Sequence, residues 1–233
     1  MTNLTGSERA EYVQGMFTRI AQHYDFMNRV MTLGQDINWR REVVQRANIQ
    51  PYGYLLDLGA GTGDLATEAY RQQPYCYPIA ADFTLEMMRV GMIRQGESRL
   101  NWSAADALKL PFPDQTFDAV ISGFVLRNVS YIRQTLCEQY RVLKPGGRIV
   151  CLDTTQPNRH LLSPLIDIHL HSIIPALGKL IAGEPEAYTY LPESTEQFLS
   201  SEQLAERMLS TGFHQVGFHK LMFGAVAIHW GIK

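Results

Sequence analysis

The sequence predicts an α/β protein built around one mostly parallel sheet. The middle of the chain alternates short β-rich runs with longer helical patterns, as expected when crossover helices connect parallel strands. A glycine turn follows the first of these runs, and only a short turn separates the last two, which predicts a hairpin. We therefore expect a doubly wound, seven-stranded sheet that ends antiparallel, flanked by N-terminal helices and an apolar helical insertion.

Five apolar runs are predicted to form the parallel strands. They are Tyr54–Leu58, Tyr77–Ala81, Asn101–Ala104, Phe117–Ser122 and Arg148–Asp153. The segments between them that have helical periodicity are Asp64–Arg71, Leu85–Arg94 and Ile132–Leu143. The sequence KPGG at Lys144–Gly147 predicts the turn into the last of these strands.

Helical and strand patterns also flank this central part. Apolar residues near the N-terminus recur at helical spacing and predict one helix with an apolar face: Val13, Met16, Phe17, Ile20 and Tyr24. Near the C-terminus, Ser201–Thr211 predicts a further helix. Gln215–Leu221 and Ala225–Ile232 predict the two hairpin strands, joined at Phe223–Gly224.

Length and composition limit the class of protein. A chain of 233 residues with 45% hydrophobic residues is long enough for one sizeable core, so we expect a single domain. The net charge of −2 and pI of about 6.4 do not fit a nucleic-acid-binding surface. Cys76, Cys137 and Cys151 are odd in number and widely spaced, which favours a reducing cytoplasm over a disulfide framework. With no signal-peptide pattern and no long uninterrupted apolar run, we expect a soluble, cytoplasmic protein.

The stretch LLDLGAGTGDLA, Leu55 to Ala66, places three glycines within five residues directly after the first predicted strand. Such a turn lets the backbone approach a ligand closely at the carboxyl end of the sheet. The dinucleotide fingerprint needs a sixth-position glycine where a pyrophosphate meets the helix, but Asp64 stands there, and no phosphate-loop Gly-Lys-Ser/Thr follows. A carboxylate at this place favours a ligand with positive charge. S-adenosylmethionine, which carries an ammonium and a sulfonium, fits.

Acids also follow the second and third predicted strands. Asp82 is placed to accept from both ribose hydroxyls of this cofactor, with Phe83 beside it to pack against the sugar or base. Asp106 is placed to accept from the adenine amino group, with the Ala107 amide near a ring nitrogen. One acid at a strand end is more often a cap or turn residue, but three at successive strand ends after a glycine loop support one cofactor site.

Segments spread along nearly the whole chain resemble one family. They are YDFMNRVMTLGQDINWR (Tyr24–Arg40), LDLGAGTGD (Leu56–Asp64), DFTLEMM (Asp82–Met88), LPFPDQTFD (Leu110–Asp118), FVLRNV (Phe124–Val129), RVLKPGGRIV (Arg141–Val150), AYTYLPESTEQF (Ala187–Phe198) and AIHWGIK (Ala227–Lys233). In these segments the chain resembles the quinone-biosynthesis C-methyltransferases, the UbiE or MenG family. The resemblance implies a Rossmann-like class I methyltransferase that methylates the ring of a prenylated hydroquinone in menaquinone or ubiquinone biosynthesis, with demethylmenaquinol as the first choice of substrate.

The resemblance also implies a set of residues that bind S-adenosylmethionine. Thr62, Asp82, Asp106 and Ala107 carry over directly, and the exit of the fourth strand lines the far side of the cofactor. The full expected set is Tyr24, Asp57, Gly59, Gly61, Thr62, Gly63, Asp82, Phe83, Met87, Asp106, Ala107, Gly123 and Phe124.

Two departures from the family pattern concern the acceptor. Val125 stands where the family usually has glycine, and DTTQP at Asp153–Pro157 replaces the usual Glu-Phe-Ser-Lys-Pro. We expect both departures on the substrate side of the site and cofactor binding to be unaffected by them.

Methyl transfer to an aromatic carbon requires an activated ring, because a neutral quinol carbon is a poor nucleophile. We expect Arg127 in LRN to stabilise the ring phenolate, since a guanidinium cannot act as a base at neutral pH. Asn128 is placed to orient the same oxygen. The alternative is that Arg127 pairs with Asp118 or Asp153 and holds its loop in place.

Three histidines are candidate proton acceptors by their chemistry, namely His23, His169 and His171. A lone histidine in an apolar context is, however, usually a hydrogen-bonded core residue. The HLH sequence has no third ligand at a recognisable spacing, so we expect no metal site, and the reaction needs none.

The expected organisation has four parts. These are an N-terminal helical lid (1–50), a cofactor-binding core (51–155), a substrate cap insertion (156–193) and a C-terminal helix and hairpin (194–233). In the lid, Tyr24, Asp25, Met27 and Asn28 are expected to close over the cofactor. The apolar segment Leu161–Ala182 fits a buried helix pair, a homodimer interface, or a cap that accepts the isoprenoid tail and contacts the membrane as a peripheral anchor.

Other functions stay open at this point. One is a methyltransferase that acts on another small aromatic or polyketide acceptor, which the two departures allow. Another is a noncatalytic methyltransferase-like subunit of a quinone-biosynthesis assembly, which the intact glycine loop and acids disfavour. A nicotinamide oxidoreductase conflicts with Asp64.

Overall fold

The structure is a computed structural model that describes residues 6–96, 100–156 and 185–233. Its strands are β1 (Tyr54–Leu58), β2 (Tyr77–Asp82), β3 (Asn101–Ala104), β4 (Phe117–Gly123), β5 (Leu143–Thr154), β6 (His214–Leu221) and β7 (Val226–Ile232). They form one seven-stranded sheet in the order β3-β2-β1-β4-β5-β7-β6. The first five strands pair in parallel, whereas β7 pairs antiparallel with β5 and β6. The predicted fold class and the antiparallel C-terminal hairpin are confirmed.

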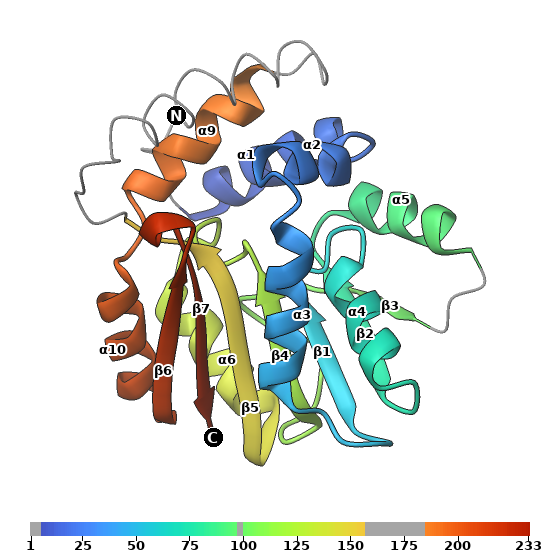
Figure 1. The fold of residues 1–233 in the computed structure, drawn as a ribbon, viewed down its shortest axis with the longest axis vertical. Helices are drawn as coiled ribbons and strands as arrows, with labels where there is room; N and C mark the ends of the chain where they lie inside the picture. Colours follow the sequence, from blue (N-terminus) through green and yellow to red (C-terminus); the bar gives the residue numbers. More distant parts are fainter. Residues whose placement is uncertain (1–5, 97–99, 157–184) are drawn as a thin grey trace.

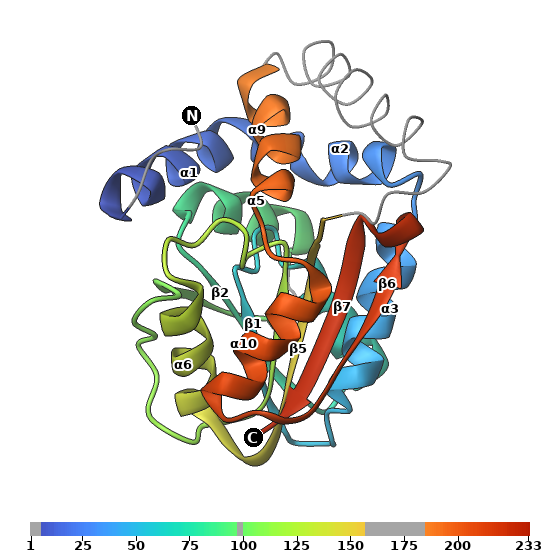
Figure 2. The same cartoon turned by 90° about the vertical axis from the view of Figure 1, so that its left-hand side faces the viewer.

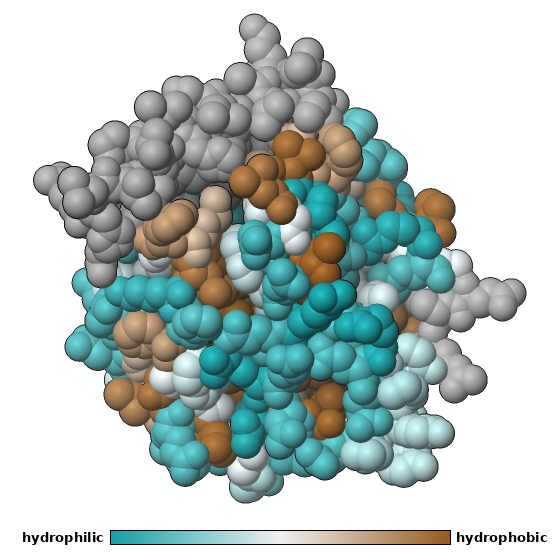
Figure 3. Space-filling model, in the orientation of Figure 1, coloured by the Kyte–Doolittle hydropathy of each residue, from teal (hydrophilic) through white to brown (hydrophobic). Residues whose placement is uncertain are grey.

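Helices cover both faces of this sheet and its upper edge. The described helices are α1 (Gly6–Ile20), α2 (Tyr24–Met31), α3 (Asp36–Ala47), α4 (Asp64–Gln72), α5 (Leu85–Gln95), α6 (Ile132–Val142), α9 (Pro185–Glu196), α10 (Ser201–Thr211) and the 3₁₀ turn η2 (Met222–Gly224). In Figures 1 and 2, α3 and α4 lie on one face, α6 and α10 lie on the other, and α1, α2 and α9 lie above the carboxyl ends of the parallel strands. Figure 3 shows that the face over α3 and α4 is largely hydrophilic.

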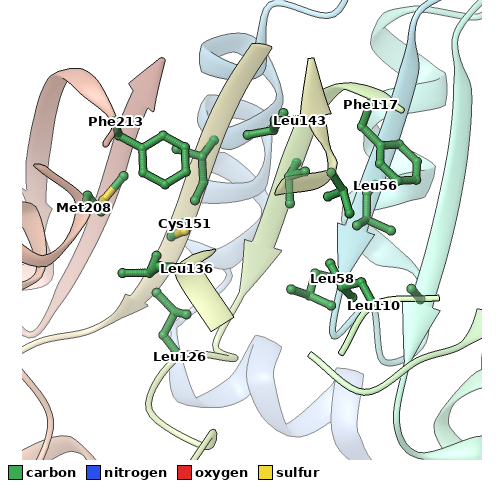
Figure 4. Close-up of a cluster of buried hydrophobic side chains, with 14 of the residues drawn as sticks. Leu56, Leu58, Leu110, Phe117, Leu126, Leu136, Leu143, Cys151, Met208 and Phe213 are labelled. Carbon is green, nitrogen blue, oxygen red and sulfur yellow. The ribbon is translucent and has the colours of Figure 1, made fainter. Parts of the chain in front are cut away.

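The core consists of two apolar clusters on opposite faces of the sheet. Because side chains alternate along a strand, Leu55 joins the cluster under α3 and α4, whereas Leu56 joins the cluster under α6 and α10. Figure 4 shows part of the second cluster, where Phe117, Leu136 and Met208 come from β4, α6 and α10. The sheet is thus buried on both faces, and only its strand ends are available for a site.

The structure corrects the predicted N-terminal helix. The chain turns after Ile20, where the His23 amide donates to the Ile20 carbonyl, and Tyr24 begins α2 instead of ending α1. The apolar residues still form one cluster, in which Met16 and Met27 pack with Tyr190 of α9. Helical spacing therefore identified the buried face and missed the bend.

Three other elements differ from the prediction. β5 begins at Leu143 instead of Arg148, and the predicted turn at Lys144–Gly147 is an irregularity inside this strand, with Gly146 at a φ of 78°. α3, which had no counterpart in the prediction, packs on β4, β5 and α4, so the last part of 1–50 covers the sheet. α9 was also missed, because Pro192 lies inside it and proline usually ends a helix.

The C-terminus is fixed to the sheet by Lys233. Its Nζ donates to the carbonyls of Tyr140, Arg141 and Leu143 at the end of α6, at 2.6, 3.3 and 2.7 Å. The carbonyls in the last turn of a helix have no partner within the helix, and a cation there also interacts favourably with the helix dipole. The final residue of the chain is therefore a helix cap.

The predicted apolar segment Leu161–Ala182 lies outside the described residues, as do His169 and His171. Among the helices of the described ranges, none combines the length and apolar character needed to cross a bilayer.

Candidate active site

A cavity lies at the carboxyl ends of β1, β2 and β4, where the strand order reverses between β1 and β4. This reversal is the place where open α/β sheets bind their ligands. We call it the main cavity; its volume is about 150 Å³. The predicted cofactor residues that line it are Tyr24, Gly59, Gly61, Asp82, Phe83, Met87, Asp106, Ala107, Gly123 and Phe124.

The glycine loop needs its glycines for two reasons. Gly59 and Gly61 have φ of 65° and 57°, a region that other residues rarely adopt. A Cβ on Gly59 would also lie 2.3 Å from Cγ2 of Val125, and one on Gly61 would lie 3.1 Å from Cε of Met87. Val125 therefore packs against the glycine loop, which corrects the expectation that this departure lies only on the substrate side.

Asp82 is buried at the end of β2 and is held by the backbone. Its Oδ2 accepts from the Gly61 amide at 2.7 Å and its Oδ1 accepts from the Thr84 amide at 2.6 Å. Burial raises the pKa of this carboxyl, while these hydrogen bonds oppose the shift. Asp82 lines the main cavity and each carboxylate oxygen can accept more than one hydrogen bond, so Asp82 retains acceptor capacity for ligand hydroxyls.

Asp106 and Ala107 lie at the end of β3 on the same cavity wall. Oδ1 of Asp106 accepts from the Leu108 amide at 2.8 Å, an Asx-type turn that fixes the loop. Asp106 can both fix the turn and bind a ligand, because Oδ1 is used in the turn and Oδ2 is left as a further acceptor.

Three predicted cofactor residues do not line the main cavity. Asp57 and Thr62 line a smaller neighbouring cavity of about 40 Å³ behind the glycine loop, which we call the loop cavity. Gly63 lines neither; it precedes α4 at a φ of 82°, and a Cβ there would lie 2.7 Å from the Trp102 ring. Gly63 is therefore a packing position at the start of α4. The hydroxyl of Thr62 donates to Asp25 at 2.7 Å, which ties the loop to α2.

Asp57 is the most perturbed carboxyl in the loop cavity. It is fully buried, and its Oδ2 accepts from the Ala66 amide at 2.9 Å, but its Oδ1 has no partner in the described part of the chain. Burial raises its pKa to about 7. A buried, unpaired carboxylate oxygen beside a glycine loop is suited to an ammonium group.

Asp64 lines the loop cavity and not the main cavity. Its carboxylate lies 3.1 Å from Nη2 of Arg40 and also pairs with Arg94, which in turn pairs with Asp25. Asp64 is thus neutralised within a network that joins α2, α3, α4 and α5. A pyrophosphate is still disfavoured, because these pairs cover the start of α4.

Arg127 follows β4 and is buried against Asp153 at the end of β5. Its Nη1 lies 2.8 Å from Oδ1 of Asp153, and its amide donates to Oδ2 at 3.2 Å. Asp118, the other partner considered from sequence, pairs with Lys144. Arg127 therefore makes the ion pair with Asp153 that was the alternative to a catalytic role. Its Nε is nevertheless buried without a partner among the described residues. The guanidinium also lies 5.0 Å from the ring of Phe124.

Asn128 is turned so that its amide nitrogen is used. Nδ2 donates to the Phe124 carbonyl at 2.9 Å, whereas Oδ1 is buried with no partner in the described ranges. The free atom is an acceptor, so Asn128 can receive a proton donor but cannot stabilise an oxyanion. This differs from the expectation that Asn128 and Arg127 hold the same oxygen.

Two further cavities, both lined by Arg127, lie near the main cavity. The helix cavity, about 40 Å³, lies between α1, α2 and α9 and shares Phe17, Tyr24 and Asn128 with the main cavity. The hairpin cavity, about 70 Å³, lies beside η2 and shares Arg127 with the helix cavity. Phe124 lines the main, loop and hairpin cavities and adopts a φ of 60°, a strained conformation of the kind that clusters at functional sites.

His23 is not in any of these cavities. It is exposed at the start of α2 and makes no side-chain cap hydrogen bond. We do not retain His23 as a proton acceptor. Within the described ranges, no group of three histidine, cysteine, aspartate or glutamate side chains is arranged to hold a metal ion.

Sequence reasoning missed the residues that tie α1 over the main cavity. Gln14 donates to the Phe83 carbonyl at 3.1 Å, and Arg9 donates to the Arg127 carbonyl at 2.7 Å. Ser130 donates to the Gly6 carbonyl at 3.0 Å. These are side-chain to backbone contacts over more than 60 residues of sequence, and no local spacing signals them.

The main and loop cavities together fit S-adenosylmethionine. The orphaned Oδ1 of Asp57 suits its ammonium, the bare backbone of Gly59 and Gly61 admits close approach, and Asp82 and Asp106 offer acceptors at two successive strand ends. A model of the ubiE/COQ5 methyltransferase family matches residues 4–233. The chain belongs to this family. It is a methyltransferase, and S-adenosylmethionine is its cofactor.

Similar proteins cover most of the chain. A UbiE ubiquinone/menaquinone biosynthesis C-methyltransferase of Desulfotalea psychrophila is 45% identical over 95% of this chain and 90% of its own length. A demethylmenaquinone methyltransferase of Roseiflexus castenholzii is 42% identical over 97% and 95%. Among solved structures, the methyltransferase in a complex with the Trm112 activator of Haloferax volcanii has a TM-score of 0.69 at 16% identity, covering 93% of this chain and 96% of its own. That likeness supports the fold.

Proposed function

We propose that this protein methylates a ring carbon of a prenylated hydroquinone, with demethylmenaquinol as the substrate and menaquinol as the product. One observation carries the proposal: the cofactor-binding cavity borders, through shared lining residues, an apolar cavity lined by a buried arginine with a free Nε–H. Relatives named for demethylmenaquinone methylation, 41% and 42% identical, support the choice of ring.

The cofactor side is held by carboxylates and backbone. When bound, S-adenosylmethionine supplies an activated methyl group. Asp82 accepts from the ribose hydroxyls, Asp106 accepts from the adenine amino group, and Asp57 accepts from the ammonium. Gly59 and Gly61 provide the space in which these contacts are made.

The acceptor side is built to ionise the ring. A phenol with a pKa of about 10 is ionised to about one part in a thousand at pH 7, a deficit of about 4 kcal/mol. The Arg127 guanidinium offsets part of this deficit by stabilising the phenolate in a cavity walled by Trp39, Phe124 and Met31. These apolar walls exclude water, which strengthens the interaction between the two charges.

The test is a product assay with purified protein. Demethylmenaquinone and a 2-methoxy-6-polyprenyl-1,4-benzoquinone are reduced in situ to their quinols. The quinols are then incubated with labelled S-adenosylmethionine. We expect transfer to the naphthoquinol ring to exceed transfer to the benzoquinol. Methylation of small phenols only would favour another aromatic acceptor, and cofactor binding without transfer would favour a noncatalytic subunit.

We also propose that the protein contacts the membrane at the mouth of the hairpin cavity, because a prenylated substrate resides in the bilayer. Leu33 and Phe223 are 81% and 64% exposed, and both occupy left-handed turns, with φ of 52° and 55°. Their neighbours Thr32 and Met222 line the hairpin cavity. Two large apolar side chains thus project beside this opening.

Vesicle co-flotation tests the membrane contact. Replacing Leu33 and Phe223 by glutamate should reduce binding to anionic vesicles severalfold and raise KM for a vesicle-borne quinol. Ile93→Glu is the matched control, since Ile93 is also 81% exposed but lies on α5, outside the cavity lining. Equal losses in both variants would contradict a contact at this place.

A further inference from the structure

Three buried polar atoms without partners belong to residues that line the hairpin cavity. They are Nδ2 of Asn28, Nε of Arg127 and Oγ1 of Thr154; none makes a hydrogen bond of good geometry among the described residues, and the Asn28 side chain interacts with the Tyr24 hydroxyl. The Asn28 and Arg127 residues are only 9% and 8% exposed. Buried polar atoms nearly always find partners, because leaving one unpaired is costly. Three such atoms around one cavity indicate a partner that the protein itself does not supply.

The chemistry of these atoms defines that partner. Asn28 Nδ2 and Arg127 Nε carry protons and can only donate, and the Thr154 hydroxyl can also donate. The remaining wall is largely apolar, with Met31, Trp39 and other nonpolar residues. The lining therefore suits a hydrogen-bond-accepting oxygen that projects from an apolar group, since about 70 Å³ is too small for a whole ring. The cavity has room for a few waters, which would pair with the same atoms until the ligand displaces them.

Asp153 fixes two of these three donors. Its Oδ1 accepts from Nη1 of Arg127 and from the amide of Thr154, both at 2.8 Å. Thr154 is also the last residue of β5 and pairs with Val226 of β7. Because one buried carboxylate and one strand pair hold both residues, Nε and Oγ1 are positioned before any ligand arrives.

Asn128 lines the helix cavity together with Asn28 and Arg127, but its free atom has the opposite character. Its only free side-chain atom is Oδ1, an acceptor that suits a protonated hydroxyl. A hydroquinone has two oxygens on opposite sides of its ring. In its singly ionised form one oxygen accepts only, while the other still donates.

We infer that the hairpin cavity is the subsite for the ionised oxygen of the acceptor, and that Thr154 is a positioning residue that donates to this oxygen beside Asn28 and Arg127. The inference rests on the proposed function for the identity of the ring. It assigns the ionised oxygen to the hairpin cavity and the protonated oxygen to Asn128, and it makes Thr154 a determinant of acceptor specificity.

Kinetics of Thr154 variants test the assignment. Thr154→Val keeps the shape and removes the hydroxyl, so we expect KM for the quinol to rise about tenfold with the affinity for S-adenosylmethionine unchanged. Thr154→Ser should restore most of the loss. The control is Thr135→Val, which removes an equally buried threonine hydroxyl on α6 that donates to the Tyr131 carbonyl outside the cavities.

A binding experiment separates this inference from the proposed function. With S-adenosylhomocysteine present, 1-naphthol and naphthalene are titrated by following the fluorescence of Trp39, which lines the hairpin cavity. We expect 1-naphthol to bind about tenfold more tightly, the preference to be lost in Thr154→Val, and the signal to be lost in Trp39→Phe. An unchanged preference in Thr154→Val overturns the subsite even if quinol is methylated, whereas normal binding without methylation of any hydroquinone overturns the proposed function alone.

Discussion

The cofactor side and the acceptor side of this site are built in different ways. On the cofactor side, Asp82 and Asp106 accept hydrogen bonds from backbone amides, so their positions are set by the strand ends that carry them. On the acceptor side, Asn28, Arg127 and Thr154 each retain a buried atom without a partner in the described structure. In the described structure the cofactor side leaves one buried atom of this kind, Oδ1 of Asp57, whereas the acceptor side leaves three.

This difference has an energetic consequence. Polar atoms that are already satisfied stabilise the fold, whereas orphaned atoms lower stability and regain that free energy when a ligand pairs with them. Variants on the cofactor side should therefore change cofactor affinity and folding together. Variants on the acceptor side should change turnover first.

The largest expected effect is at Arg127, which has both a satisfied and an unpaired polar atom: its Nη1 pairs with Asp153, whereas its Nε has no partner among the described residues. Arg127→Ala would leave Asp153 buried and unpaired, so a loss of about 3–5 kcal/mol in folding stability would obscure any catalytic loss. Arg127→Lys keeps a cation beside Asp153 and removes the Nε donor. We expect the methyl-transfer rate to fall on the order of 10²-fold with cofactor affinity nearly intact.

The pH–rate profile of Arg127→Lys identifies the cause of that loss. If phenolate formation limits the variant, its activity should recover towards about pH 9–10, where the ring ionises unaided. If the pH–rate profile of the variant instead ran parallel to that of the unmodified protein and its Tm were lower, the role of Arg127 would be to hold its loop in place. Arg133→Lys, an exposed arginine on α6, should change neither quantity.

The next effect tests the cofactor side at the contact between Gly59 and Val125. Gly59→Ala places a methyl group 2.3 Å from Cγ2 of Val125 and imposes a φ of 65° on alanine. Overpacking of this kind costs about 1–3 kcal/mol, so affinity for S-adenosylmethionine should fall by roughly tenfold or more. The double variant with Val125→Gly should recover the part of the affinity loss that is due to the steric clash, and not the part that is due to the strained φ of alanine. No recovery would show that Val125 does not press on the loop.

A third prediction concerns Asp57 and pH. Burial raises the pKa of Asp57 to about 7, and only its ionised form attracts an ammonium, so affinity for S-adenosylmethionine should fall as pH drops below 7, towards about tenfold per unit. Calorimetry from pH 5.5 to about 8.5 measures this. Asp57→Asn should bind more weakly at pH 8 and lose the pH dependence; a slope that persists in this variant would assign the proton to another group.

Stability should respond to Asp57 in the opposite direction. Its pKa is raised in the folded protein above the usual 3.8, so the folded state binds the proton more tightly, and ionisation destabilises it as pH rises from about 4 to 7. Asp57→Asn should therefore raise the Tm of the cofactor-free protein at pH 8 and have little effect at pH 4. A gain of equal size at both pH values would contradict this account.

The same contrast explains what could be predicted from the sequence. The residues of the cofactor side follow strand ends directly, and strand ends are visible as apolar runs followed by glycine or acid, so Asp82 and Asp106 were identified with their strands. The ion pairs of Asp64 were not predicted, because its partners, Arg40 and Arg94, lie 24 and 30 residues away on other helices. No periodicity in a sequence encodes such a pairing.

The acceptor side depends almost entirely on such distant pairings. The contact between Asp153 and Arg127 was one of two alternatives. Asp153 lies at the carboxyl end of β5, at the edge of the sheet that Arg127 also occupies, whereas Asp118 lies at the amino end of β4 and pairs with Lys144. Thr154 attracted attention only as part of a departure from the family pattern. Thr154 lines the hairpin cavity together with Asn28 of α2, which is far from it in the sequence, so the sequence alone does not bring the two residues together.

The smallest expected effect is at Lys233, which lies outside both sides of the site. Its Nζ caps three carbonyls at the end of α6 and lies 4.7 Å from the Tyr140 ring. Lys233→Met should remove about 1–2 kcal/mol of folding stability and lower Tm by a few degrees, with kcat and cofactor affinity unchanged. Lys220→Met is the control, because Lys220 pairs with an exposed glutamate, Glu202, and such pairs contribute about 1 kcal/mol or less. If Lys233→Met weakened cofactor binding without lowering Tm, the C-terminus would be coupled to the site, and the separation between cap and catalytic residues drawn here would be wrong.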